Sequence, residues 1–115
     1  MDYYHTLLSQ RRVRLVLDER VVVLELIRGE LHLSTKIFDA CGFVPQEISD
    51  CIAAATLLKW EEKIAFKEED GNILFTQVRV GLILPKDIDL ALRLFVALAG
   101  EWEDIIASVL VRELV

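Results

Sequence analysis

Apolar and polar residues alternate through the first third of the chain, the pattern of strands with one buried face. Val13, Leu15 and Leu17 alternate with charged residues from Arg12 onward. The same period continues over residues 21–27 and 31–37, after short polar turns. Three strands joined by short turns predict an antiparallel meander.

The second of these strands is apolar on both faces, which is unusual for a sheet with one wet side. The alternation divides its apolar residues into two sets: Val22, Leu24 and Leu26 on one face, and Val21, Val23 and Ile27 on the other. One face is expected to meet the core helices. The other must meet something else, so Val21, Val23 and Ile27 are the predicted partner-binding surface.

The second half of the chain predicts a hairpin followed by a long helix. Residues 63–69 and 72–80 flank Asp70-Gly71, and Asp-Gly between alternating segments is a strong hairpin signal. Pro85 then precedes an amphipathic helix predicted over residues 87–113. The apolar side of this helix is predicted to hold Ile88, Ala91, Leu92, Phe95, Leu98, Ala99, Trp102, Ile105, Ile106 and Val109.

A shorter helix is predicted between the meander and the hairpin, over residues 45–60. Its core stripe comprises Ile48, Cys51, Ile52, Ala55 and Leu58. A second apolar stripe on another side holds Ala53, Leu57 and Trp60. A helix with two apolar stripes usually packs against two partners, here its own sheet and a second subunit. These three residues are therefore the predicted dimer contact.

A short helix over residues 2–10 completes the predicted order, α-β-β-β-α-β-β-α. The order predicts an α+β fold, with an antiparallel sheet of about five strands and helices packed on it. The chain has 115 residues, enough for one core and too few for two, so residues 1–115 are expected to form a single domain.

The composition points to an interface. Apolar residues make up 54% of the chain and the mean hydropathy is +0.41, above the level usual for a small globular domain. Such a surplus favours an obligate dimer or a permanently occupied groove. No uncharged stretch is long enough to span a bilayer and no signal-peptide pattern occurs, so we expect a cytoplasmic protein that does not enter a membrane.

Charge and motifs argue against nucleic-acid binding and catalysis. The net charge is −6, and the one basic cluster is Arg11, Arg12 and Arg14, too small a footprint for phosphate binding. The sequence has no CxxC, HExxH or glycine-rich phosphate motif, so no metal, no cofactor and no enzymatic activity are expected. A pairing of His32 with Cys41 or Cys51 is conceivable, although reduced buried thiols are the favoured interpretation.

From Pro45 onward the chain resembles the class I type III secretion chaperones and their YbjN-like structural relatives. The similarity rests on three segments: the helix end Leu57-Leu58-Lys59-Trp60, the acidic hairpin at residues 66–75, and the helix at residues 91–102 with Trp102. It implies a small acidic cytoplasmic homodimer without catalysis, which holds the N-terminal region of a secreted effector in a soluble, export-competent state.

The alternative is a small dimeric α+β adaptor or regulatory scaffold, either YbjN-like or roadblock-like. The roadblock order normally places three strands after the middle helix, whereas this sequence predicts two, which weighs against that family.

Overall fold

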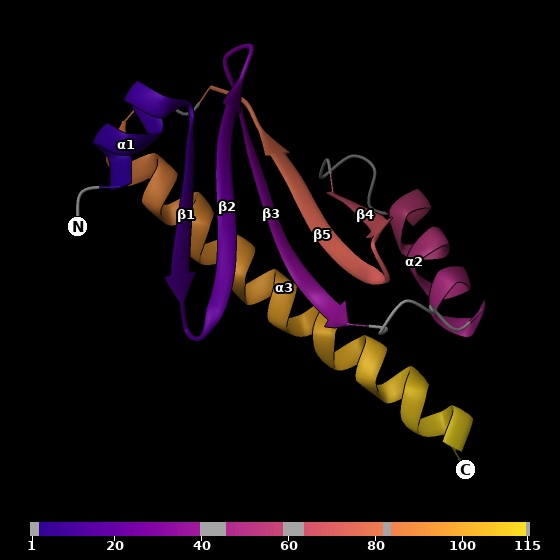
Figure 1. Cartoon of the computed structure of the whole chain (residues 1–115). Helices are drawn as coiled ribbons and strands as arrows, with labels where there is room; N and C mark the ends of the chain where they lie inside the picture. The colour runs from indigo at the N-terminus through magenta and orange to yellow at the C-terminus, as the bar shows by residue number, and fades with distance from the viewer. Residues whose placement is uncertain (1–2, 40–45, 59–63, 82–83, 115) are drawn as a thin grey trace.

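A computed structural model describes residues 3–39, 46–58, 64–81 and 84–114 of the chain, with the side chains of residues 55–58 and 110–114 left outside the description. The predicted α+β fold and element order are confirmed (Figure 1). In chain order the elements are α1 (Tyr3–Gln10), β1 (Arg12–Leu17), β2 (Arg20–Ile27), β3 (Glu30–Asp39), α2 (Gln46–Leu58), β4 (Ile64–Glu69), β5 (Asn72–Arg79) and α3 (Pro85–Leu114).

The five strands form one antiparallel sheet in the order β1-β2-β3-β5-β4. The β1-β2-β3 meander and the β4-β5 hairpin therefore join where β3 pairs with β5, from Leu31 opposite Arg79 to Asp39 opposite Asn72. The register shifts between Lys36 and Phe38, which marks a bulge in this pairing. Consequently β1 and β4 are the two edges of the sheet (Figure 1).

Tight turns connect the hairpins, and their backbone angles explain the residues found there. Asp70 and Gly71 have φ of 52° and 78°, the left-handed pair that a two-residue turn of type I′ requires. Arg28 and Gly29 show the same pairing between β2 and β3. The Asp-Gly hairpin predicted from the sequence is thus confirmed.

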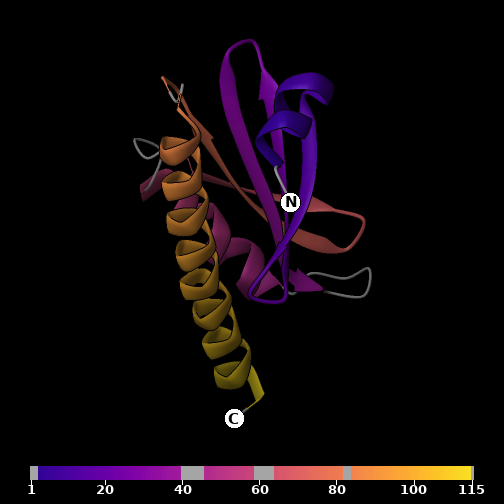
Figure 2. The same cartoon turned by 90° about the vertical axis from the view of Figure 1, so that its left-hand side faces the viewer.

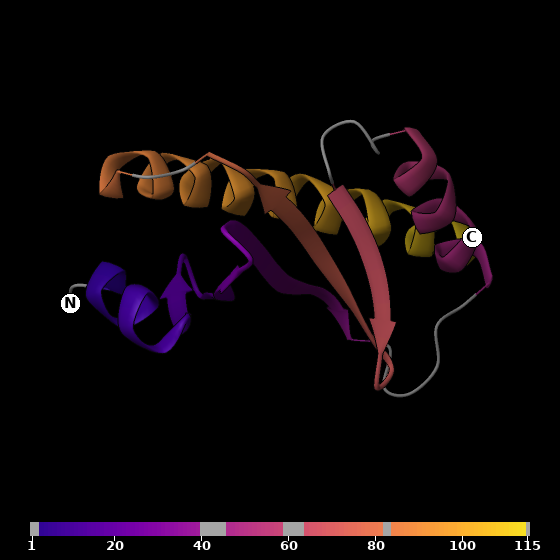
Figure 3. The same cartoon turned by 90° about the horizontal axis from the view of Figure 1, so that it is seen from above.

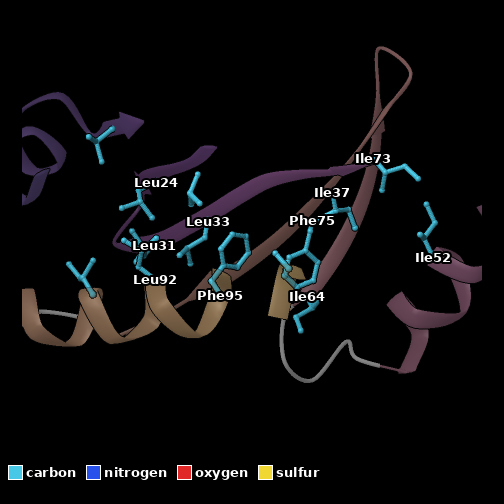
Figure 4. Packing of buried hydrophobic residues seen from close by; sticks show 14 of the residues in the cluster. Leu24, Leu31, Leu33, Ile37, Ile52, Ile64, Ile73, Phe75, Leu92 and Phe95 are labelled. Carbon is cyan, nitrogen blue, oxygen red and sulfur yellow. The ribbon is translucent and has the colours of Figure 1, made fainter. Parts of the chain in front are cut away.

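All the described covering helices lie toward one face of the sheet or at its edges. The long helix α3 crosses one face, α2 packs against β4 and α3, and α1 lies beside β1 (Figures 1, 2 and 3). Side chains from the strands point toward Leu92 and Phe95 of α3 (Figure 4). The largest fully buried side chains of this core are Phe75, Phe95, Leu7, Leu24, Leu31, Leu33, Ile48, Ile73, Leu92, Ile106 and Val22.

Aromatic contacts fix α3 against the hairpin. The rings of Phe75 and Phe95 stack with centroids 5.1 Å apart, and Trp102 meets Phe66 edge-on at 5.2 Å. Trp102 therefore belongs to the core side of α3, as predicted. Ile105 was predicted on the same side, but it is 42% exposed. Ile105 lies at the border of the buried stripe, so its side chain faces solvent.

Polar contacts attach α2 and α3 to the sheet at two further points. The Arg20 guanidinium of β2 lies 3.3 Å from the Glu103 carboxylate of α3 and donates a 3.3 Å hydrogen bond to the Lys36 carbonyl. The Ser49 hydroxyl of α2 donates to the Glu68 carboxylate of β4 at 2.8 Å. These contacts orient α2 and α3 on the sheet.

Gly100 in α3 leaves room for a side chain, since a Cβ built there meets no atom within 4 Å. Replacing Gly100 with Ala should raise the free energy of unfolding by up to about 1 kcal/mol, because Ala lowers the backbone entropy of the unfolded chain. Urea denaturation followed by circular dichroism measures the change. A destabilised variant would contradict the open environment of this position.

Val21 and Val22 are neighbours on opposite faces of β2, which makes them a matched pair. Val22 is fully buried and Val21 is 37% exposed. We expect Val22→Ala to cost about 2 kcal/mol, because it removes two buried methyl groups and leaves a cavity. We expect Val21→Ala to cost less than about 1 kcal/mol. Equal losses in urea denaturation would show that both faces of the sheet are covered in solution.

Candidate functional site

The face of the sheet turned away from α3 forms a shallow groove of about 700 Å³, which we call the open face. In Figure 3, α3 lies on one side of the sheet and no described element covers the other. Its lining combines apolar, polar and charged residues: Arg12, Arg14, Val21, Val23, Glu25, Ile27, His32, Leu33, Ser34, Thr35, Lys36, Lys67, Glu69, Leu74, Thr76, Gln77 and Val78.

Alternation along β2 places the three predicted partner-binding residues together on this face. Val21 and Ile27 are 37% and 42% exposed, and Val23 is half-buried between them. All three line the groove. Whether they contact a partner stays a prediction, but the sequence pattern correctly assigned them to the face opposite the core.

Cross-strand pairing builds the floor of the groove from small side chains. One row runs from Arg14 through Val23, Ser34 and Thr76 to Ala65, and so crosses all five strands. The Thr76 hydroxyl donates a 3.1 Å hydrogen bond to the Ala65 carbonyl. The floor is therefore low at its centre, which leaves space for side chains of another molecule.

A parallel row places lysines beside an apolar residue. Lys36 of β3 pairs with Leu74 of β5, which pairs with Lys67 of β4. Sequence reasoning missed these lysines as a group, because they are brought together by the pairing of β3 with β5 and not by local spacing. Arg14 was recognised only as part of a basic cluster at the entrance to a strand.

Each of three groove cations lies near a carboxylate. The Arg12–Glu25, Lys67–Glu69 and Lys36–Asp39 pairs have nitrogen–oxygen separations of 3.6, 3.3 and 3.7 Å, and all are well exposed. Exposed pairs of this kind are weak and easily exchanged. For the Arg14 guanidinium, no ion pair or hydrogen bond is found among the residues that the structure describes.

His32 lies on the open face opposite Glu25, with its Nε2 3.7 Å from a Glu30 oxygen. This distance is too long for a hydrogen bond. Cys51 is half-buried on α2, which packs against β4 and α3, and Cys41 falls outside the described residues. In the described part of the chain, no hydrogen bond joins His32 to Cys51.

The predicted dimer contact is only partly visible. Ala53 is exposed on α2. The side chain of Leu57 and the whole of Trp60 lie outside the described residues. The contact therefore stays a prediction.

A second apolar surface, on α3, was missed from the sequence. Leu90, Leu94 and Ile105 are 58%, 48% and 42% exposed. The four-residue spacing of Leu90 and Leu94 places them on one face of the helix, which is the pattern that could have indicated this surface. Because α3 is so apolar, the sequence alone does not separate this face from the neighbouring core stripe.

In the described parts of the chain, His, Cys, Asp and Glu side chains form no group of three or more that could hold a metal ion. Over the same residues, no helix has both the length and the apolar character needed to cross a bilayer.

Comparison with known proteins gives a structural match only. No family model matches the sequence, and no curated protein does. Among solved structures, a chain from the crystal structure of the ExsC–ExsE complex is similar, with a TM-score of 0.71 and 15% sequence identity over 85% of this chain and 78% of that chain. The chain therefore shares the α+β fold of that chain.

Proposed function

We propose that this protein is a non-catalytic, cytoplasmic binding protein of the type III secretion chaperone kind. It holds the N-terminal region of a secreted protein in a soluble, export-competent state. The observation that carries the proposal is the open face, an uncovered sheet surface with Val21, Val23 and Ile27 in its groove, on a secretion chaperone-like fold.

Physical chemistry supports protein binding on this face. In stable monomeric proteins, the solvent-exposed face of a sheet usually carries polar residues. Strand β2 instead places three branched apolar side chains on that face. A bound segment would remove these side chains from water, and each would contribute through the apolar area that it buries. The solved neighbour is itself part of a complex of two proteins, which agrees with a binding role.

The groove suits an extended or helical chain segment more than a small metabolite. It is shallow and spread over all five strands. Small-molecule sites are usually enclosed clefts that bury most of the ligand. A partner chain can instead follow the sheet and place alternate side chains in the low central rows.

Partner binding can be tested by co-expressing the protein with candidate secreted proteins encoded by neighbouring genes. The double variant Val21→Asp/Val23→Asp should weaken binding of the true partner by at least about tenfold, because it places unpaired carboxylates in a desolvated contact. Calorimetry with the purified partner fragment measures the affinity, and limited proteolysis identifies the protected region.

Leu94→Asp is the matched control, because it makes a similar change at an exposed leucine on α3. It should leave the affinity unchanged, and circular dichroism should show both variants folded. Loss of binding in Leu94→Asp, with full binding by the double variant, would move the binding site to α3. A partner protected only in its C-terminal region would contradict the export role.

We further propose that two copies of the chain associate through the second stripe of α2, formed by Ala53, Leu57 and Trp60. Ala53→Asp should convert the dimer to a monomer in light scattering, since it places a charge in an apolar contact. Ala54 is its exposed neighbour on the helix, so Ala54→Asp serves as the control and should remain dimeric. An unchanged mass for Ala53→Asp, Leu57→Asp and Trp60→Asp would contradict this contact.

A further inference from the structure

We infer that the open face selects partner segments that carry acidic residues on both sides of a short apolar stretch. This inference rests on the proposed binding function and adds the chemistry of the partner. It follows from the distribution of charge over the molecule and from the positions of the groove cations on the strands of the sheet.

The charge of the groove is opposite to that of the rest of the chain. Four cations and two carboxylates line the groove: Arg12, Arg14, Lys36, Lys67, Glu25 and Glu69. The whole chain has 13 Lys and Arg and 19 Asp and Glu, so 9 cations and 17 carboxylates remain elsewhere. An acidic segment is therefore repelled by most of the surface and attracted at this face.

Two of the groove cations stand at opposite edges of the sheet. Arg14 lies on the edge strand β1 and Lys67 on the opposite edge strand β4 (Figure 1). Four strand spacings separate these edges, about 19 Å, which an extended segment of about six residues spans. Between them lie Val23 on β2, Lys36 on the central strand β3 and Leu74 on β5.

Arg14 is the strongest candidate anchor for a carboxylate. It is exposed, and its guanidinium has no ion pair or hydrogen bond within the described part of the chain. A guanidinium binds a carboxylate through two parallel hydrogen bonds, which adds geometric specificity to charge attraction. Lys67 and Lys36 form exposed ion pairs with Glu69 and Asp39. They would give up these pairs and bind carboxylates of the segment.

Protection of sheet edges against aggregation is another use for charged residues on β1 and β4. It does not account for Lys36, which lies on the inner strand β3. Cations are also the scarcer charge on this acidic chain, and four of its 13 lysines and arginines gather in this one groove. The excess of cations on this one face therefore favours recognition of an anionic partner.

The chemistry of the groove favours an acidic protein segment over a nucleic acid. Four cations, three of them beside carboxylates, are a small footprint against a chain with a net charge of −6. The valines and leucine between the cations offer contacts that a phosphate backbone cannot use.

The test uses the full chain labelled with ¹⁵N and synthetic peptides of about seven residues, long enough to cross the sheet when extended. The peptides share an alternating Val-Ser centre and carry Glu, Gln or Lys at both ends. Amide shifts in NMR titrations at millimolar peptide give both affinity and location. We expect the Glu peptide to bind about tenfold more tightly than the Lys peptide, with shifts at Val23 and Thr76.

Charge reversal at the anchor provides the decisive comparison. Arg14→Glu should abolish or invert the preference for the Glu peptide, and added salt should weaken that preference in the unmodified chain. Arg93→Glu is the matched control, because Arg93 is an exposed arginine on α3, outside the groove. It should leave the preference unchanged.

Equal binding of the Glu and Lys peptides, shifts confined to α3, or no shift with the Glu peptide would overturn the inference. Displacement of the Glu peptide by an equal concentration of oligothymidylate would also overturn it, in favour of nucleic acid. These outcomes are separate from failure of the proposed function, because the peptides need no secreted partner. A chain that prefers the Glu peptide but binds no secreted protein would retain the charge selectivity and lose the chaperone role.

Discussion

The packing of α3 along one face of the sheet is the contact on which the rest of the structure depends. Phe95 stacks on Phe75, and Leu92 and Ile106 are fully buried against the same face. This helix of 30 residues shares the cover of the strands with Leu7 of α1 and with Ile48 and Ile52 of α2, which are buried in the same core. Because this helix covers one face and no described element covers the other, the same arrangement that creates the core also leaves the open face available.

The sequence predicted those parts of the fold that depend on local periodicity. Alternation assigned Val21 and Val22 to opposite faces, and Asp70-Gly71 located the hairpin, because strand period and turn geometry are properties of short segments. The position of β5 between β3 and β4 was not predicted. That position depends on how the β1-β2-β3 meander pairs with the β4-β5 hairpin. Such long-range pairing cannot be read from a short segment of the sequence.

The same limit applies to the candidate site. Val21, Val23 and Ile27 lie on one strand, so their common face could be read from the sequence. Lys36 and Lys67 become neighbours of the same leucine only through long-range pairing. On α3, the exposed Leu90 and Leu94 could not be separated from the core stripe, because the helix is apolar around more than half of its circumference.

The sheet consists of two locally paired pieces joined along the single β3–β5 seam. Each piece contains hairpins that pair residues close in sequence, whereas the seam pairs residues far apart, so we expect the seam to close late in folding. The groove crosses this seam, with Val23 on one piece and Leu74 and Thr76 on the other. A segment bound there would contact both pieces and oppose their separation, so its binding would raise the free energy of unfolding of the whole sheet.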